Sequence, residues 1–436
     1  MTDLASMLVD QEERLSHCVH CGFCLPVCPT YVRLRDENDS PRGRLHLMRA
    51  VAGGRLLTED ETFGVHIDRC LGCRACETVC PSGVEYGVLL EKAREDIVRK
   101  KGQAWVVKML LGAFASPGMR RVSLGLARVL RASRIPVILA KLLPDSPWLR
   151  APRLGLAMLA TTGGPGTRAL PVLNEPRRPA SPTAPGSRGR VGMLTGCVQE
   201  GLFRRVNEAT RRVLTVNGWE VVDVPGQGCC GALHAHSGEL AGARALAREN
   251  VEAFGRLDLD FVVVNAAGCG AAMKEFGELL AEDQTWGGRA GAVAERVRDF
   301  NELLAETGVV QGGSIPEKVT VDRPCHLVHA QRVGSQPEDV LRVGVPDLEI
   351  IPLEGADECC GGAGIYGITH PDLGGRIGAD KVSAIIATGA RMALSANPGC
   401  MMQIGAELLL RGSQIGVLHP AELLDESYRR AGFYQD

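Results

Sequence analysis

Two cysteine runs of identical spacing near the N-terminus constrain the fold of this chain more than any other feature. Each run reads C-x2-C-x2-C-x3-C-P, and the eight cysteines are Cys18, Cys21, Cys24 and Cys28 in the first run and Cys70, Cys73, Cys76 and Cys80 in the second. Cysteines at this spacing, closed by proline and present twice, are typical of ferredoxins that carry two 4Fe–4S clusters. One tight loop reaches only three irons of a cluster, so the fourth ligand has to arrive from elsewhere.

The fourth cysteine of each run is expected to bind the cluster of the other run, as in two-cluster ferredoxins. The predicted ligand sets are Cys18, Cys21, Cys24 and Cys80 for one cluster, and Cys70, Cys73, Cys76 and Cys28 for the other. Structural zinc is the alternative, because zinc sites also use cysteine clusters. Zinc sites usually pair two C-x2-C units across a longer gap, so the spacing favours iron–sulfur clusters.

The composition excludes several classes of protein. The chain has 436 residues, 45% of them hydrophobic, and a formal net charge of −2, which does not indicate a nucleic-acid-binding or disordered protein. Residues 1–14 are rich in acidic side chains and lack the apolar core of a signal peptide. Sixteen cysteines in such a chain predict metal or redox chemistry in the cytoplasm rather than disulfides.

No transmembrane segment is expected. The longest apolar stretch, residues 104–115, is interrupted by Lys108 and falls short of the roughly 18–20 residues that span a bilayer. We therefore expect a cytoplasmic protein, free or peripheral on the inner face of the cytoplasmic membrane.

The chain divides into four expected segments. Residues 1–101 form an α-helical ferredoxin domain, in which Ser40-Pro41 caps a helix that ends at Gly53-Gly54 and residues 88–101 form another helix. Residues 102–190 form a basic helical connector followed by a linker rich in Pro, Gly, Ser and Thr at 163–189. Residues 191–315 and 316–436 form two cysteine-rich lobes.

The connector has an unusual charge balance. Between Arg99 and Arg190 the only acidic residues are Asp145 and Glu175. Helices packed on a neighbouring domain with a solvated basic face would explain this pattern. A docking surface for a partner subunit or for an anionic membrane is the alternative.

The two lobes are an internal repeat. Matching cysteines lie about 130 residues apart, and a fixed period of this kind indicates duplication. Each cysteine or cysteine pair follows a short β-type run, at 191–194, 219–224, 261–264, 319–321, 348–353 and 391–394, with helical patterns such as 204–216 and 240–256 between them. Alternating strands and helices predict a parallel, doubly wound sheet in each lobe, with the cysteines at the carboxyl ends of the strands. The expected fold class is thus an α-helical two-cluster ferredoxin domain followed by two pseudo-symmetric α/β lobes.

Each lobe offers four thiols as a candidate additional redox centre. They are Cys197, Cys229, Cys230 and Cys269 in the first lobe, and Cys325, Cys359, Cys360 and Cys400 in the second. Each adjacent pair is followed by glycine, which permits the sharp bend that would turn both cysteines toward one site. Buried, inert cysteine is the alternative, and two matching sets make it the weaker one.

These motifs resemble the iron–sulfur subunit of bacterial glycolate oxidase. The resemblance rests on the two ferredoxin runs, Ser40-Pro41-Arg42-Gly43-Arg44, Leu194-Thr195-Gly196-Cys197, the two Cys-Cys-Gly elements and Asn397-Pro398-Gly399-Cys400. It implies a subunit that takes electrons from an FAD-containing 2-hydroxy-acid dehydrogenase subunit and passes them through two 4Fe–4S clusters to a membrane quinone. Similar chains serve lactate and anaerobic glycerol-3-phosphate dehydrogenase systems, so the oxidised substrate stays open, and no residue of this chain is assigned as catalytic.

One departure concerns the related heterodisulfide reductase subunit, whose lobes end in Cys-x-x-Cys and supply five ligands. The last position is Ala272 in the first lobe and Gln403 in the second. Thiol–disulfide chemistry on heterodisulfides is therefore the weaker alternative, and a third iron–sulfur centre in the lobes stays open.

Two arginines and four histidines near the cysteines leave alternatives open. Arg42 and Arg44 either tune a cluster or lie solvated in a first helical turn, and the latter is favoured. Histidines near the cysteine loops, His234, His236, His326 and His329, either serve the site or simply pack. No nucleotide-binding glycine motif is present, so we expect the flavin to belong to a partner.

Overall fold

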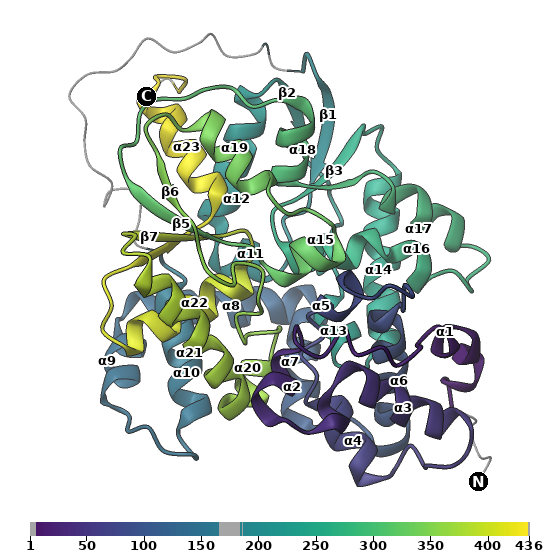
Figure 1. Cartoon of the computed structure of the whole chain (residues 1–436). Helices are drawn as coiled ribbons and strands as arrows, with labels where there is room; N and C mark the ends of the chain where they lie inside the picture. The colour runs from purple at the N-terminus through teal and green to yellow at the C-terminus, as the bar shows by residue number, and fades with distance from the viewer. Residues whose placement is uncertain (1–5, 165–183, 185, 435–436) are drawn as a thin grey trace.

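The computed structural model describes residues 6–164, 184 and 186–434, and it combines helices with two separate β-sheets (Figure 1). Much of the linker expected at 163–189 lies outside the described residues. The N-terminal part is drawn in purple and the last helix in yellow in Figure 1.

Described residues up to 101 form helices and loops without a strand. The elements are η1 (Val9–Gln11), α1 (Glu12–Ser16), α2 (Pro29–Leu34), η2 (Glu37–Asp39), α3 (Pro41–Ala52), α4 (Glu61–Asp68), α5 (Ala75–Thr78) and α6 (Tyr86–Lys101). The predicted cap of α3 is confirmed, since Ser40 Oγ accepts the N–H of Gly43 at 2.9 Å and Gly53 is the C-cap. The cysteine runs occupy the loops that these helices hold in place.

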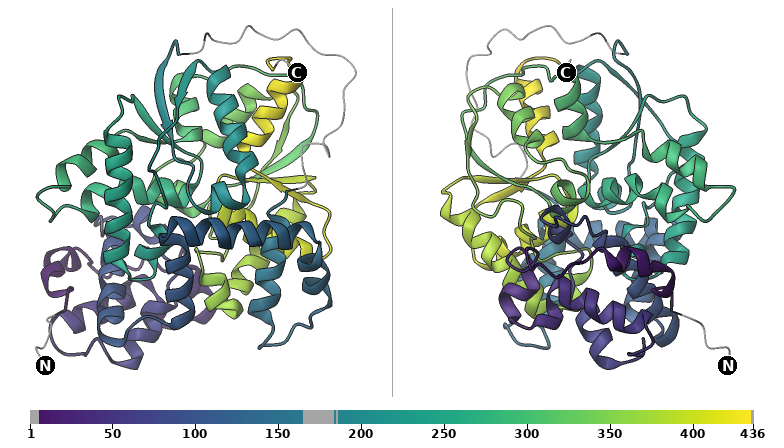
Figure 2. Two further views of the ribbon diagram at one scale, coloured as in Figure 1. Left: turned by 180° about the vertical axis from the view of Figure 1, so that it is seen from behind. Right: turned by 45° about the vertical axis from the view of Figure 1, so that its right-hand side comes forward.

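The connector is helical as expected. It consists of α7 (Trp105–Ala115), α8 (Pro117–Ala132), α9 (Ile135–Leu142) and α10 (Arg150–Thr161). The back view in Figure 2 shows α8 lying across the side of the molecule that is turned away in Figure 1. Its Leu124 is buried and contacts α11 close to Gly201.

The next part carries a four-stranded parallel sheet in the order β2-β1-β3-β4. Its elements are β1 (Gly189–Met193), α11 (Val198–Leu202), α12 (Arg204–Val216), β2 (Trp219–Val222), α13 (Ala232–His236), α14 (Leu240–Gly255), β3 (Phe261–Val264), α15 (Ala267–Lys274), α16 (Phe276–Leu279), α17 (Gly287–Ala294), β4 (Val297–Asp299) and α18 (Phe300–Thr307). The strands expected at 191–194, 219–224 and 261–264 are present, and β4 is a further strand that was not predicted.

The last part repeats this topology in a second parallel sheet, in the order β6-β5-β7-β8. Its elements are β5 (Lys318–Asp322), the π-helix η4 (His326–Ala330), α19 (Gln336–Gly344), β6 (Glu349–Ile351), α20 (Tyr366–Thr369), α21 (Pro371–Ala387), β7 (Met392–Ser395), α22 (Pro398–Leu410), β8 (Gly416–Leu418) and α23 (Pro420–Arg430). The expected strands are again present, and β8 was missed.

One hydrophobic core joins the two sheets. Val191 and Val263 from the first sheet pack in the same buried cluster as Val319 and Leu394 from the second. The cysteine loops of the two parts also meet, because the N–H of Gly268 donates to Asn397 Oδ1 at 3.3 Å. The sheets therefore place their cysteine loops close to one another.

The glycine after each cysteine pair adopts the conformation that the sequence predicts. Gly231 has φ +86° and Gly361 has φ +82°, values that residues with a side chain rarely adopt. A Cβ at Gly361 would overlap the carbonyl oxygen of Gly374. This glycine is therefore required both by its backbone angle and by close packing against α21.

Candidate iron–sulfur site

The first cysteine set lines a cavity at the surface. Cys18, Cys21 and Cys24 come from the loop between α1 and α2, and Cys80 comes from the loop after α5; Cys76, within α5, also lines this cavity. Cys21 is exposed, whereas Cys18, Cys24 and Cys80 are partly buried. Burial raises the pKa of the Cys24 thiol to about 11, so this thiol must lose its proton when it binds a metal.

The second set lines a neighbouring cavity, and two of its cysteines, Cys28 and Cys70, are buried. Its thiols are Cys28, Cys70, Cys73 and Cys76. Cys28 lies at the start of α2, which leads it away from the other three cysteines of its own run. The Cys70 sulfur accepts the N–H of Gly72 at 3.4 Å and the Tyr86 hydroxyl at 3.5 Å. Such donors suit a thiolate ligand, so the residues present fit a bound iron–sulfur cluster.

A buried arginine, Arg44, supports this second set, so the expectation that it lies in a solvated turn is wrong. Arg44 is 1% exposed and lines the cavity of the second set. Its guanidinium donates to His66 O at 2.6 Å, to Thr30 Oγ1 at 3.1 Å and to Asp39 Oδ1 at 3.2 Å. Burial alone would lower the pKa of Arg44. The negative charges of Cys70, Cys28 and Asp39 outweigh this effect and raise the pKa above its usual value, so this arginine stays charged.

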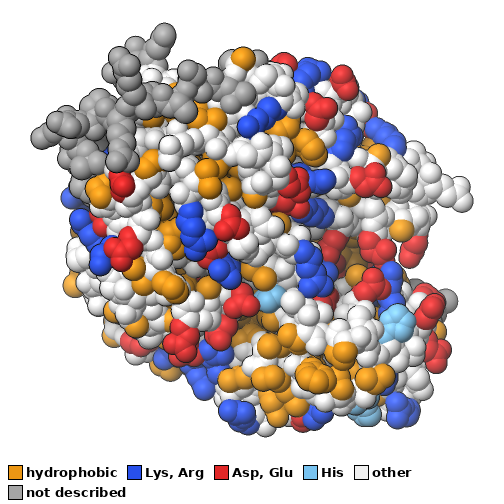
Figure 3. Space-filling model, turned by 45° about the horizontal axis from the view of Figure 1, so that its top comes forward, with side chains coloured by type: hydrophobic (Ala, Val, Ile, Leu, Met, Phe, Trp, Pro, Cys, Tyr) orange, Lys and Arg blue, Asp and Glu red, His pale blue; other side chains and the backbone are white. Residues whose placement is uncertain are grey.

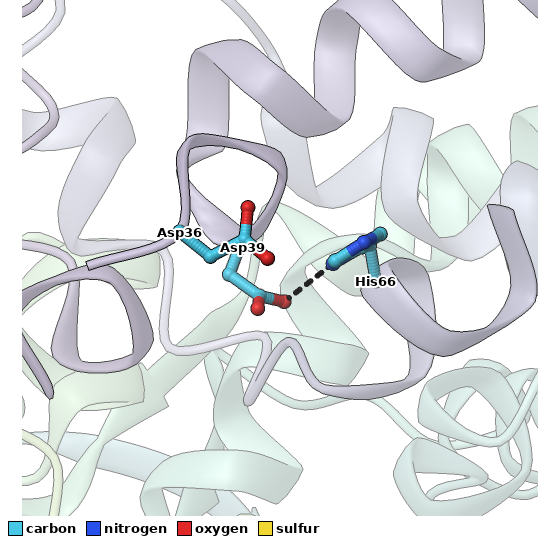
Figure 4. A group of neighbouring side chains, drawn as sticks. All are labelled: Asp36, Asp39 and His66. Atoms are coloured by element: carbon cyan, nitrogen blue, oxygen red, sulfur yellow. Dashed lines mark hydrogen bonds and ion pairs between the residues drawn. The ribbon is translucent and has the colours of Figure 1, made fainter. Parts of the chain in front are cut away.

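Asp39 is the counter-ion of this arginine rather than a metal ligand. Asp36, Asp39 and His66 bring three potential ligand atoms together (Figure 4). The Asp39 carboxylate already pairs with Arg44, with His66 Nδ1 at 3.0 Å and with Arg69 Nη1 at 3.0 Å. A carboxylate with three such partners is satisfied without a metal ion. Nothing in the cysteine spacing pointed to this network.

Arg42 differs from Arg44 although only one residue separates them. Its side chain is 30% exposed and pairs with Glu37 at 2.6 Å, and the residue lines the cavity of the first set. Both arginines lie in the first turn of α3. Side chains two residues apart in a helix point to nearly opposite faces, so Arg42 faces solvent whereas Arg44 faces the core.

Each of the two sheets also gathers its four cysteines. In the first part, hydrogen bonds link the four thiols in a row: Cys197 contacts Cys229, Cys229 contacts Cys230, and Cys230 contacts Cys269. The same order joins Cys325, Cys359, Cys360 and Cys400 in the second. Hydrogen bonds from neighbouring thiols lower the pKa of Cys229 and of Cys360. One thiol of each set is therefore predisposed to act as a thiolate.

The second ferredoxin set abuts the second sheet's cysteines. Cys28 and Cys73 line one cavity together with Cys325 and Cys359. Cys73 and Cys325 also pack against the same apolar cluster, around Tyr366. The sequence did not predict that this set, rather than the first, would meet a lobe.

Comparison with known proteins assigns the two kinds of domain and the family of the chain. A model of the 4Fe-4S dicluster domain matches residues 14–84, and a model of the cysteine-rich domain matches residues 191–274 and 319–405. The chain is 36% identical to a probable glycolate oxidase iron-sulfur subunit of Bacillus subtilis, over 95% of this chain and 94% of the relative. It is 33% identical to the glycolate oxidase iron-sulfur subunit of Escherichia coli, over 97% and 96%.

The chain belongs to the family of glycolate oxidase iron–sulfur subunits. A lactate utilization protein A of Exiguobacterium is 29% identical over 55% of this chain and 99% of its own length. The resemblance read from the motifs is thus confirmed. In this family member, no helix of the described residues is both long and apolar enough to cross a membrane.

The histidines near the cysteines make packing contacts. His326 Nε2 lies 3.0 Å from the carbonyl oxygen of Gly72, and its ring lies 5.0 Å from that of His236. His329 contacts Thr78 Oγ1 at 2.9 Å through Nδ1. These contacts join the ferredoxin loops to the lobes, and the buried His234 has no hydrogen bond to its Nδ1 within the described residues.

Ala272 and Gln403 stand where the heterodisulfide reductase subunit has its fifth cysteine, and neither residue carries a thiol. Ala272 packs beside the core of the first sheet. Gln403 is fully buried, and neither atom of its amide has a hydrogen-bond partner among the described residues. A Cβ at Gly362 would approach both the Gln403 Cβ and the Cys360 sulfur, and a Cβ at Gly378 would approach both the Gln403 amide nitrogen and the Cys360 carbonyl oxygen, so the Gln403 side chain lies beside Cys360.

Proposed function

We propose that this chain is the electron-transfer subunit of a glycolate oxidase (glycolate dehydrogenase) complex. It receives electrons from an FAD-containing subunit that oxidises a 2-hydroxy acid, and it passes them through two 4Fe–4S clusters toward a membrane quinone. The observation that carries the proposal is the pair of adjacent cysteine-lined cavities, in a chain related over nearly its whole length to glycolate oxidase iron–sulfur subunits. Oxidation of glycolate to glyoxylate then takes place on the partner subunit.

The cluster ligands proposed are the crossed sets. The first is Cys18, Cys21, Cys24 and Cys80, and the second is Cys70, Cys73, Cys76 and Cys28. Support comes from the two cavities, because Cys28 lines only the second and Cys80 only the first. Cys76 lines both cavities, so the two sites are immediate neighbours.

The burial of the two sets suggests the direction of electron flow. Bound 4Fe–4S clusters supply one-electron transfer, with potentials set by nearby charge, hydrogen bonds and solvent. The first set includes the exposed Cys21, whereas Cys28 and Cys70 of the second are buried. A partner can approach the first set directly, and the second set lies on the path from there to Cys325.

The proposed layout has four parts. Residues 1–101 form an α-helical ferredoxin domain, 102–190 a connector and linker, and 191–315 and 316–436 two pseudo-symmetric cysteine-rich α/β lobes. The identical strand orders of the two sheets support this division. The four clustered thiols in each lobe are suited to a further iron–sulfur centre, and the unpartnered Gln403 amide beside Cys360 supports such a centre in the second lobe. We place the complex in the cytoplasm, at the inner face of the membrane.

Reconstitution of the complex tests this function. The chain would be co-produced with its flavoprotein partner under anaerobic conditions, and glycolate-dependent reduction of a soluble dye would be measured. Cys21→Ser should abolish electron flow through this chain while the partner still binds glycolate and reduces its own flavin. Unchanged electron flow in Cys21→Ser would refute the assignment.

The second candidate function is the same role in a lactate-oxidising complex. It is favoured by the likeness to lactate utilization protein A, which covers 55% of this chain. Substrate choice belongs to the partner, so assays of one complex with glycolate, lactate and glycerol-3-phosphate separate these candidates. A heterodisulfide-reductase-like activity would instead require disulfide reduction by this chain without a flavoprotein.

A further inference from the structure

The connector helices expose an unusual amount of apolar surface. Among the described residues, 21 large hydrophobic side chains are exposed, and 13 of them lie between residues 105 and 148. The most exposed are Trp148 at 90%, Leu142 at 73% and Trp105 at 72%. So many exposed apolar side chains in one segment point to an interaction site, because soluble domains rarely leave large apolar areas uncovered.

The apolar side chains of α8 form a stripe along one face of the helix. Met119, Val122, Leu126 and Val129 follow one another at intervals of three or four residues, and each is more than half exposed. Leu124, which lies on the opposite side, is 8% exposed and holds the helix against the rest of the molecule. The stripe therefore faces away from the protein core.

Positive charge accompanies this apolar surface. Residues 102–162 contain nine Lys or Arg and one acidic residue, a net charge of +8, while the whole chain carries −2. The remainder of the chain therefore has a net charge of −10. Five exposed basic side chains of the connector form no ion pair within the described part of the chain, and they are Lys108, Arg121, Arg128, Arg134 and Lys141. On the face drawn in Figure 3, by contrast, basic and acidic side chains are intermixed.

A lipid surface fits this combination better than a protein does. Protein interfaces are depleted of lysine and of unpaired charge at their centre, whereas Lys108 and Lys141 are interspersed with the exposed apolar residues. Interfacial helices combine an apolar face with Lys and Arg, whose long side chains reach the headgroups. Tryptophan is also enriched at the membrane interface, and Trp105 and Trp148 lie at the two ends of this segment.

We propose that α7, α8 and α9 form a membrane-binding surface that inserts its apolar face shallowly into a bilayer of anionic lipids. No helix of the described chain is able to span the bilayer, so attachment is peripheral. The purpose of this attachment, delivery of electrons to a membrane carrier, rests on the proposed function. The binding itself depends only on the surface.

Vesicle sedimentation of the purified, iron-loaded full chain tests the proposal. We expect strong binding to phosphatidylcholine vesicles that contain about one-third phosphatidylglycerol and weak binding to pure phosphatidylcholine. Raising the ionic strength from about 0.1 M to about 1 M should reduce binding, since the screening length falls from about 10 to about 3 Å. Equal binding to both kinds of vesicle, or none to either, overturns the proposal.

Two double variants separate the charge from the apolar contribution. Arg121→Gln with Arg128→Gln should lower the vesicle partition coefficient about 25-fold, at about fivefold for each charge removed. Val122→Ser with Leu126→Ser should lower it about tenfold. All four side chains are exposed, so folding, followed by iron content and circular dichroism, should be unchanged.

The matched control lies in the ferredoxin part, where Arg55 and Leu57 are both exposed. Arg55→Gln with Leu57→Ser should change binding by less than about twofold. Wild-type binding by both connector variants overturns the proposal. Loss of co-purification with the flavoprotein, with vesicle binding intact, also overturns it and makes the connector a subunit interface. Failure of glycolate-dependent dye reduction with vesicle binding intact would instead refute only the proposed function.

Discussion

Replacing Arg44 by glutamine should lower the reduction potential of the second cluster. Arg44 is a fully buried charged group that lines that site, and it reaches the Cys28 sulfur through Thr30. A positive charge favours the reduced form of a cluster, because reduction adds an electron. Glutamine keeps a side chain that can donate hydrogen bonds to Thr30 or to the His66 carbonyl, but it removes the charge.

The distances set the size of the effect. The Cys28 sulfur lies 3.2 Å from Thr30 Oγ1, which lies 3.1 Å from Arg44 Nη1. These contacts place the charge within about 6 Å of the sulfur, where a unit charge at an effective dielectric constant of about 20 contributes about 2.8 kcal/mol. This energy corresponds to about 120 mV for one electron. Asp39 pairs with Arg44 at 3.2 Å and opposes it, so we expect about half, a fall of about 60 mV.

Redox titration followed by EPR would measure this shift cluster by cluster. Arg44→Lys keeps the charge and should hold the potential within about 20 mV of wild type. Arg42→Gln is the matched control at the first set, where solvent and Glu37 already screen the charge, so both potentials should move by less than about 20 mV. An unchanged second potential in a fully iron-loaded Arg44→Gln protein would show that this charge does not tune the cluster.

Arg44→Gln also has a cost in stability. Removing one partner of a buried ion pair typically destabilises a protein by about 3–5 kcal/mol. Asp39 keeps His66 and Arg69 as partners, so we expect the lower end of this range. Chemical denaturation of the metal-loaded protein would measure it, with Arg44→Lys as the comparison.

Three further predictions follow from single sites. Cys28→Ser should remove the EPR signal of the second cluster, which Cys73→Ser also removes, and should leave the signal of the first cluster, which Cys21→Ser removes. Loss of the first cluster's signal in Cys28→Ser would mean that the ligands are not crossed. Burial lowers the pKa of His419 to about 3, and the unfolded imidazole titrates near 6.5, so the free energy of unfolding should fall by about 2 kcal/mol from pH 8 to pH 5. His419→Asn, which retains an N-cap acceptor, should flatten that fall in urea titrations, and an equal slope would contradict the assignment. Gly361→Ala should destabilise the protein by about 2–3 kcal/mol, because φ is +82° and the added Cβ meets a backbone oxygen; wild-type stability would argue against this backbone geometry.

The sequence predicted the elements that have a clear period. The helix expected at 204–216 is α12 with identical bounds, because its apolar positions recur at helical spacing along one buried face. The strands before each cysteine were predicted because each is a short apolar run. β4 and β8 were missed because neither leads into a cysteine and neither stands out as an apolar run: β4 reads Val-Arg-Asp and β8 begins with glycine.

Arg44 was placed wrongly for a different physical reason. Ser40 and Pro41 predict the start of a helix, where arginine side chains are normally solvated. The burial of Arg44 depends on Asp39, His66 and Arg69, which come from separate elements, and their meeting is a tertiary event that no local pattern encodes. The same holds for the contact of Cys73 with Cys325, which required the placement of one domain on another.

That placement arranges the four cysteine sets in one continuous series. Cys76 lines the cavities of both ferredoxin sets, and Cys73 of the second set lines a cavity with Cys325. Gly268, next to Cys269 of the first sheet, donates to Asn397 of the second sheet's Cys400 loop.

The far end of this series lies beneath the connector. Cys197 and Cys229 of the first sheet pack against Phe114, a residue of α7. Electrons that enter at the exposed Cys21 and leave through α7 would therefore pass every cysteine set of the chain in turn. Cys70 of the second ferredoxin set also lines a cavity with Val107 of α7, so the lobes would add a second route to the connector beside this shorter one.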